Sequence, residues 1–246
     1  TPDSALDIQA QTGATTLDIA VHDGTIRYDA TAGELNVAFA GAQIPGGRAD
    51  ITMKEYSARV LFPLAALEGE RPFQANVGLK EVILPEVVWR IADPDGHLPH
   101  DPAHLRLTFE GTLEDGADLF DMTAPDAPDG DGTQMPFKMK TIRMPEIFLS
   151  LAGATIKGDG AGRFLDREPV VPGGMPPFVG TLSLNLMGVG DLITELSASG
   201  ILPSEDAMSV QMLLGLFARP GRTPGELVSE IEMTEEGAII VNGEPL

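Results

Sequence analysis

Three of the four histidines in the sequence lie within one short segment, at His97, His100 and His104. Neutral imidazole is a common metal ligand, and acidic residues between these histidines could complete a site for a divalent cation such as zinc. The spacing is poor for that purpose, because Pro99 and Pro102 would interrupt any helix that aligned two of the rings. We therefore predict a solvated turn, with the three histidines as weak candidate metal ligands only.

A second group of potential ligands is formed by Asp126, Asp129 and Asp131, in an acidic stretch rich in glycine and proline. Closely spaced carboxylates of this kind occur in calcium loops. The register of such loops is not met, however, and no glutamate stands where it would close the coordination. The favoured interpretation is an acidic surface loop over residues 114–132, which could bind a partner protein.

Two groups of glycines have a superficial likeness to nucleotide-binding turns. Gly188 and Gly190 lie between an expected strand and an expected helix, but Ile193 takes the third glycine position of the dinucleotide motif. The alternating glycines at 158, 160 and 162 fail the same motif, because residue 163 is an arginine. Both groups are predicted to be turns or β-bulges.

No set of residues in the sequence assembles a catalytic centre. There is no Gly-x-Ser-x-Gly motif for a serine hydrolase, and a chain without cysteine has no thiol nucleophile, disulfide or cysteine-ligated metal. We predict that the protein is not an enzyme and needs no cofactor. The enzymatic alternative is a metal-dependent reaction at the histidine segment.

The charge balance limits the possible partners. With 16 basic and 37 acidic residues, the formal net charge is −21. Such a surface repels phosphate backbones and anionic lipid headgroups, so nucleic-acid binding is not expected. The charge most simply serves solubility, and the alternative is an acidic patch for a basic partner. No apolar run is long enough for a transmembrane segment.

Most of the elements that would position these residues are predicted to be β-strands. Apolar and polar residues alternate through Leu17, Ile19 and Val21, and the pair Asp23-Gly24 that follows is a strong hairpin signal. Similar alternation, separated by turn signals, continues through much of the chain. We predict a mainly β (α+β) protein, either one large curved antiparallel sheet or a β-sandwich-like meander, with two helices near the C-terminus.

Three segments have helical patterns, namely residues 86–92, 191–198 and 204–219. Ser204 is a possible N-cap of the last one. Met208 and Met212 on that helix are expected to pack against the sheet, and the alternative is a face that contacts a partner or lipid. Trp89, the only tryptophan, is a further candidate contact.

The domain organisation is predicted to be a single elongated β-rich domain over residues 1–246, the C-terminal part of a longer chain. A proline- and glycine-rich connector at 163–177 could divide it into 1–162 and 178–246.

Several ordered segments together carry a resemblance to a known family. They are Val88-Trp89-Arg90-Ile91-Ala92-Asp93-Pro94, Leu98-Pro99-His100-Asp101-Pro102-Ala103, Gly173-Gly174-Met175-Pro176, Gly200-Ile201-Leu202-Pro203, Phe217-Ala218-Arg219-Pro220-Gly221 and Val241-Asn242-Gly243-Glu244-Pro245-Leu246. From about Ile26 onward, the chain resembles the C-terminal half of the alphaproteobacterial family called domain of unknown function 2125. Its closing strands are similar to the end of YdgA-like envelope proteins, and its strand pattern more distantly to AsmA-like ones.

The resemblance implies export to the periplasm or beyond, and it transfers no activity, cofactor or catalytic residue. The function we expect is that of a non-catalytic periplasmic envelope protein, whose curved one-sided sheet handles lipid or another hydrophobic ligand. The alternative is a structural or interaction module that binds an envelope protein through the acidic loop or a sheet edge. An apolar face left open as a groove would favour the first, and a closed core the second.

Overall fold

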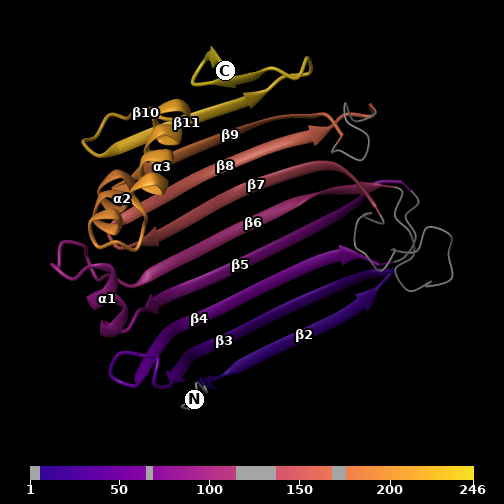
Figure 1. The fold of residues 1–246 in the computed structure, drawn as a ribbon. Helices are drawn as coiled ribbons and strands as arrows, with labels where there is room; N and C mark the ends of the chain where they lie inside the picture. The colour runs from indigo at the N-terminus through magenta and orange to yellow at the C-terminus, as the bar shows by residue number, and fades with distance from the viewer. Residues whose placement is uncertain (1–5, 65–68, 115–136, 168–175) are drawn as a thin grey trace, which may run out of the picture.

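The computed structural model describes residues 6–64, 69–114, 137–167 and 176–246. These residues form one open antiparallel sheet of 13 strands and three helices (Figure 1). The strands are Asp7–Gln11 (β1), Thr15–His22 (β2), Thr25–Ala40 (β3), Arg48–Pro63 (β4), Arg71–Ile83 (β5), Ala103–Glu114 (β6), Lys138–Leu151 (β7), Ala154–Phe164 (β8), Phe178–Met187 (β9), Arg219–Pro220 (β10), Glu226–Met233 (β11), Ile239–Val241 (β12) and Glu244–Pro245 (β13). The helices are Glu86–Ala92 (α1), Val189–Ala198 (α2) and Ser204–Phe217 (α3). The prediction of a mainly β protein is confirmed, in its single-sheet form.

The order of strands in the sheet follows the order of the chain almost throughout. Strands β3 to β9 pair successively, β11 follows β9, and β12 and β13 complete that side. At the other edge, β1 and β2 both pair with β3 in one continuous register, from Asp7 opposite Ala40 to His22 opposite Thr25. Asp23 and Gly24 have positive φ angles of 49° and 68°, which suit a two-residue hairpin turn, as the sequence predicts.

The sheet has one apolar and one polar face, because side chains alternate along each strand and residues paired across strands share a face. The apolar face is defined by the aliphatic and aromatic residues that the register aligns from strand to strand. Its larger members include Leu17, Ile19, Val21, Tyr28, Val60, Val77, Leu79, Leu105, Leu107, Ile147, Leu149, Ile156, Leu182, Leu184, Leu186, Ile231 and Val241.

The polar face carries ion pairs between neighbouring strands. They include Arg27 with Asp18, Arg59 with Asp29, Arg143 with Glu110, and Arg106 with Glu146. Such exposed pairs contribute little individually, but they keep this face wet and soluble.

Helices α2 and α3 cover only the C-terminal part of the apolar face. Helix α2 packs on β8 and α3 on β11, as the grouping of the orange helices in Figure 1 shows. The hydroxyl of Ser229, an apolar-face residue that is only 3% exposed, donates a 2.6 Å hydrogen bond to the carbonyl of Phe217 at the end of α3. Ala154 and Leu186 on the same face are also buried.

A compact core lies beside the helices, where α1 meets the β7–β8 turn. Trp89 of α1 is 5% exposed and clusters with Leu98 and Ala152, and Leu84, Leu151 and Leu192 pack around them. The indole also stacks on the His100 ring, with centroids 4.2 Å apart and planes 10° from parallel. Trp89 therefore holds the core together, and its assignment as a contact residue is wrong because little of its surface reaches solvent.

Two further expectations need correction. The alternating glycines at 158, 160 and 162 are not turns but lie inside β8, on the apolar face, paired with Leu184, Leu182 and Gly180 of β9, and Gly158 and Gly160 flank a register shift between β8 and β7 whose extra residue belongs to β7. The side chains of Leu184 and Phe178 occupy the space where a Cβ at Gly158 and Gly162 would stand. Ser204 does not cap α3, since Pro203 takes that position without a side-chain hydrogen bond. Gly188 is a turn residue, in the left-handed conformation that begins α2.

Candidate functional site

The strongest candidate site is the part of the apolar face that no helix covers. Among the described residues, most of the helix–sheet packing involves β8 and β11, and Leu151 at the end of β7 joins the core around Trp89, whereas β2 to β6 carry no helix packing of comparable extent. Val77 on β5 and Leu149 on β7 are 38% and 36% exposed, although they stand in the middle of the sheet. At the N-terminal edge, Leu17, Ile19 and Val21 are more than half exposed.

The apolar face is exposed because the sheet forms a single layer. A sheet with one apolar face normally buries it against a second layer. Here the only fully buried large side chain among the described residues is Leu113, and most apolar-face residues are intermediate in exposure. They contact each other sideways along the face while their outer surface stays open. An apolar surface of this extent is typical of sites for hydrophobic ligands or partners.

Helix α3 adds a second exposed apolar surface. Ala207 is buried and Val210, Leu214 and Phe217 are partly buried, whereas Met208 and Met212 are each 70% exposed, and Leu213 and Leu216 are 50% and 53% exposed. The expectation that Met208 and Met212 pack against the sheet is wrong, because the smaller Ala207 sits at the close contact. Both methionines remain candidates for contact with lipid or a partner.

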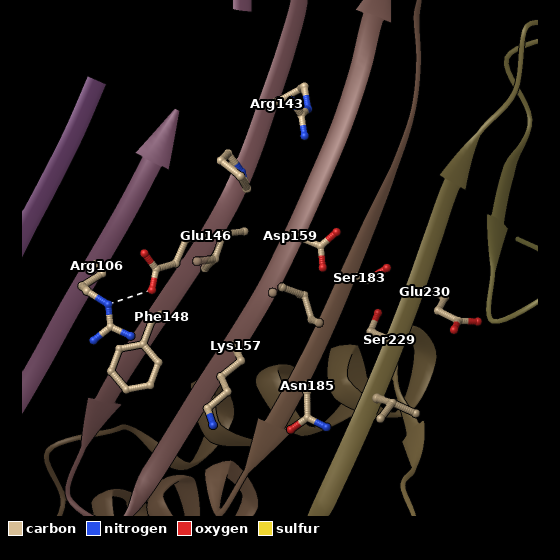
Figure 2. Close-up of a pocket in the computed structure, with 15 residues that line it drawn as sticks. Arg106, Arg143, Glu146, Phe148, Lys157, Asp159, Ser183, Asn185, Ser229 and Glu230 are labelled. Carbon is tan, nitrogen blue, oxygen red and sulfur yellow. Dashed lines mark hydrogen bonds and ion pairs between the residues drawn. The ribbon is translucent and has the colours of Figure 1, made fainter. Parts of the chain in front are cut away.

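A shallow depression of about 730 Å³ lies on the polar face, over β6 to β11 (Figure 2). Its labelled charged side chains lie on the side of the sheet opposite the helices, which lie behind the strands in this view, whereas Ser229 points toward the end of α3. Arg106 is bound to Glu146 at 2.7 Å and stacks over the Phe148 ring at 4.2 Å. Arg143 pairs with Glu110, and Glu230 with Arg219.

Those pairs satisfy most of the charges around the depression. Ser183 lies in it with Lys157 and Asp159, but none of the hydrogen bonds or ion pairs among the described residues joins this serine to a base. The arrangement therefore offers no activated nucleophile. It is an exposed hydrophilic surface, and the apolar face remains the better candidate.

The histidine segment is organised by Asp93, a residue that is 5% exposed at the end of α1. Its carboxylate accepts hydrogen bonds from the backbone amides of His97 at 2.8 Å and Leu98 at 2.9 Å, and lies 3.2 Å from Nε2 of His100. Burial raises the pKa of the Asp93 carboxyl, but these hydrogen bonds outweigh it and hold the pKa below its ordinary value. The segment is thus a structured turn.

The three histidines have three different surroundings. His97 is exposed, and its Nδ1 lies 3.0 Å from the Glu195 carboxylate of α2. His100 is exposed, as expected of a solvated turn, although its ring stacks on Trp89 and its Nε2 lies 3.2 Å from the Asp93 carboxylate. His104 lies on β6, on the polar face as its sequence parity indicates, and its Nδ1 accepts a 3.3 Å hydrogen bond from the Glu81 amide.

Asp93, His97 and Glu195 bring their ligand atoms within 4.8 Å of one another. Three such groups could hold a cation. Both oxygens of Asp93 are already occupied by hydrogen bonds within the turn, and His100 and His104 lie outside this group. The geometry suits a link between the turn and α2 better than a metal site. Glu195 had no sequence signal, because it is almost a hundred residues from His97.

This link makes stability depend on pH. The Glu195 carboxylate raises the pKa of His97, with smaller effects from Asp95 and Asp93. Because the folded pKa exceeds the unfolded one, the contribution is complete below the unfolded pKa and is lost as pH rises through the folded pKa. We expect Glu195→Gln to lower the urea midpoint more at about pH 5.5 than at about pH 8.5.

The matched control is Glu205→Gln on α3, which removes an exposed carboxylate that forms no ion pair among the described residues. Its effect on the urea midpoint should be the same at both pH values. Equal losses at both pH values for Glu195→Gln would show that the pair does not depend on the histidine charge.

Asp126, Asp129 and Asp131 lie outside the described residues, so the acidic-loop prediction stays a prediction. Within the described part of the chain, no helix is both long and apolar enough to cross a membrane.

The fold defines the class of the molecule as a mainly β protein built on one open antiparallel sheet. No model of a known protein family matches the chain, and no curated protein matches it either. The resemblance to domain of unknown function 2125 and to the YdgA-like and AsmA-like proteins therefore stays a prediction.

Proposed function

We propose that the protein is a non-catalytic envelope protein that binds the acyl chains of lipids along the open apolar face. The observation that carries the proposal is the alignment of apolar side chains over neighbouring strands β2 to β7, most of which have no covering helix among the described residues. An acyl chain would bury this surface at a gain of about 25 cal/mol per Å² of apolar area. Neither a nucleophile nor a metal is needed for such binding.

The charge distribution supports a lipid chain rather than a headgroup as the recognised part. The net charge of −21 opposes anionic headgroups at the surface. The apolar face itself offers mostly aliphatic groups, and the cations of the opposite face are largely paired with acids. We further propose export to the periplasm, on the basis of the sequence resemblance to envelope families.

A direct test is to measure binding of a fluorescent phosphatidylethanolamine with a labelled acyl chain to the purified 246-residue chain. We expect saturable binding by the natural sequence. Val77→Asp should weaken it by about tenfold or more, because a carboxylate at this position of the apolar face must be desolvated on contact with the chain. Leu149→Asp, two strands away, should have a similar effect.

The matched control is Thr31→Asp, which adds the same charge at an exposed position of the polar face, opposite Ser57. It should leave lipid binding unchanged. Equal weakening by Thr31→Asp and Val77→Asp would indicate a general charge effect. The absence of saturable binding by the natural sequence would contradict the proposal.

A further inference from the structure

The two edges of the sheet differ in how well they are protected. Unprotected edge strands pair readily with other chains, and proteins guard against this with short strands, prolines and charges. At the C-terminal side, β13 has two residues, Glu244 and Pro245, and the short β10 beside β11 also contains a proline. At the N-terminal side, β2 has eight residues, no proline and a single charged residue, Asp18.

The backbone of β2 is free on its outer side among the described residues. The amide of Gly33 on β3 donates to the carbonyl of Ala14 at 2.9 Å. In an antiparallel pair, every second residue uses its N–H and C=O towards the neighbour. Ala14 thus directs its backbone groups towards β3, and the even-numbered residues of β2 that follow it do the same. The odd-numbered residues Leu17, Ile19 and Val21 therefore direct their N–H and C=O groups outwards.

The residues with free backbone groups are also the most exposed aliphatic residues of the strand. Leu17, Ile19 and Val21 are 58%, 57% and 59% exposed and stand on the apolar face, opposite Ala30, Tyr28 and Ile26. One surface thus combines unsatisfied hydrogen-bonding groups with apolar side chains. A strand added at this edge would satisfy both at once.

The sequence of β2 is complementary to itself in one antiparallel register. If Ile19 lies on a two-fold axis opposite its counterpart, Leu17 faces Val21 of the other copy, and Asp18 faces Ala20. The two aspartates then lie diagonally, and each is paired with Arg27 of its own chain at 2.9 Å. A register centred on Asp18 would place two carboxylates directly opposite each other, which is unfavourable.

We propose that two copies of this chain associate through antiparallel pairing of their β2 strands, with Ile19 on the two-fold axis. The pairing joins both sheets edge to edge and makes their apolar faces continuous. It rests on the edge geometry alone, and it holds whether or not the apolar face binds lipid.

The test is sedimentation velocity of the 246-residue chain at about 100 μM in low and in moderate salt, where screening reduces the repulsion between two highly acidic copies. We expect a species of twice the 26.0 kDa chain mass, more populated at higher salt. Ile19→Lys places two like charges opposite each other and removes two buried isoleucines. It should weaken association by on the order of 100-fold.

The control is Ile8→Lys on β1. Ile8 has the same 57% exposure at the same sheet edge but lies outside the paired segment, so its replacement should leave the dimer intact. Since the chain contains no cysteine, Ile19→Cys also gives a single attachment point for a short thiol cross-linker. We expect a cross-linked dimer from Ile19→Cys and none from Ile8→Cys.

Three results would overturn the proposal. The first is a monomer at every salt concentration, which would leave the edge to another strand. The second is a dimer that Ile19→Lys does not weaken, or that Ile8→Lys weakens equally. The third is a series of larger aggregates instead of a dimer. The lipid-binding measurement with Val77→Asp is independent of all three, so failure of one proposal is distinguishable from failure of the other.

Discussion

Trp89→Ala is expected to lower the free energy of unfolding by about 3–5 kcal/mol, the usual cost of deleting a buried large aromatic side chain. The indole joins α1, the turn after it, the β7–β8 turn and α2, through Leu98, Ala152 and Leu192. Its stacking partner, His100, would lose its support and with it the geometry around Asp93. The measurement is urea denaturation followed by far-ultraviolet circular dichroism.

Trp89→Phe is the matched variant, because it keeps an aromatic ring beside His100 while removing part of the volume. It should recover more than half of the lost stability. A loss below about 1 kcal/mol for Trp89→Ala would mean that this cluster adds little to global stability, contrary to typical core deletions.

Gly111→Ala is expected to destabilise the protein by about 3 kcal/mol, at the upper end of the range for overpacking. A Cβ at this position would stand 2.1 Å from the backbone oxygen of Thr141 and 2.7 Å from Cε1 of Phe73. The Phe73 ring can rotate, but the Thr141 carbonyl is held in the pairing of β6 with β7, which already contains register shifts near Thr108 and Thr112. Relief therefore requires movement of the sheet backbone.

Gly215→Ala in α3 is the opposite case and serves as the control. A Cβ there meets no heavy atom within 4 Å, and alanine favours the helix by about 1 kcal/mol over glycine. Thermal unfolding should show a lower midpoint for Gly111→Ala and an equal or higher one for Gly215→Ala. Tolerance of alanine at Gly111 would indicate that β6 and β7 separate more easily than their register implies.

Much of the fold could be predicted from local sequence patterns. The Asp23-Gly24 hairpin, helix α1 and the start of α3 follow from turn chemistry, apolar periodicity and proline positions, all of which act over a few residues. The alternation of apolar and polar residues was compatible with two architectures, a single curved sheet and a β-sandwich-like meander, and the structure has the first. Alternation specifies that a face is apolar but not whether a second layer covers it.

The predictions that the structure corrects concern contacts between segments that are distant in the sequence. Trp89 looked like a free contact residue, and only the turn at 93–102 and the β7–β8 turn bury it. Glu195 approaches His97 because the fold brings α2 next to the turn that follows α1, although the two segments are far apart in the sequence. The glycines of β8 were predicted to be turns or bulges, and they are tolerated in a strand because Leu184, Leu182 and Phe178 of β9 cover them. Met208 and Met212 show that helical apolar periodicity alone does not identify the packed side.

The near-sequential order of the strands makes the molecule a one-dimensional array. Each strand depends mainly on its immediate neighbours, so stability is a chain of nearest-neighbour terms, as in repeat proteins. The terminal strands have one neighbour and the central ones have two. Opening therefore begins at the outer strands and moves inward, and local unfolding there costs less than at β5 to β7. Capping either end against fraying would raise the cooperativity of the entire array.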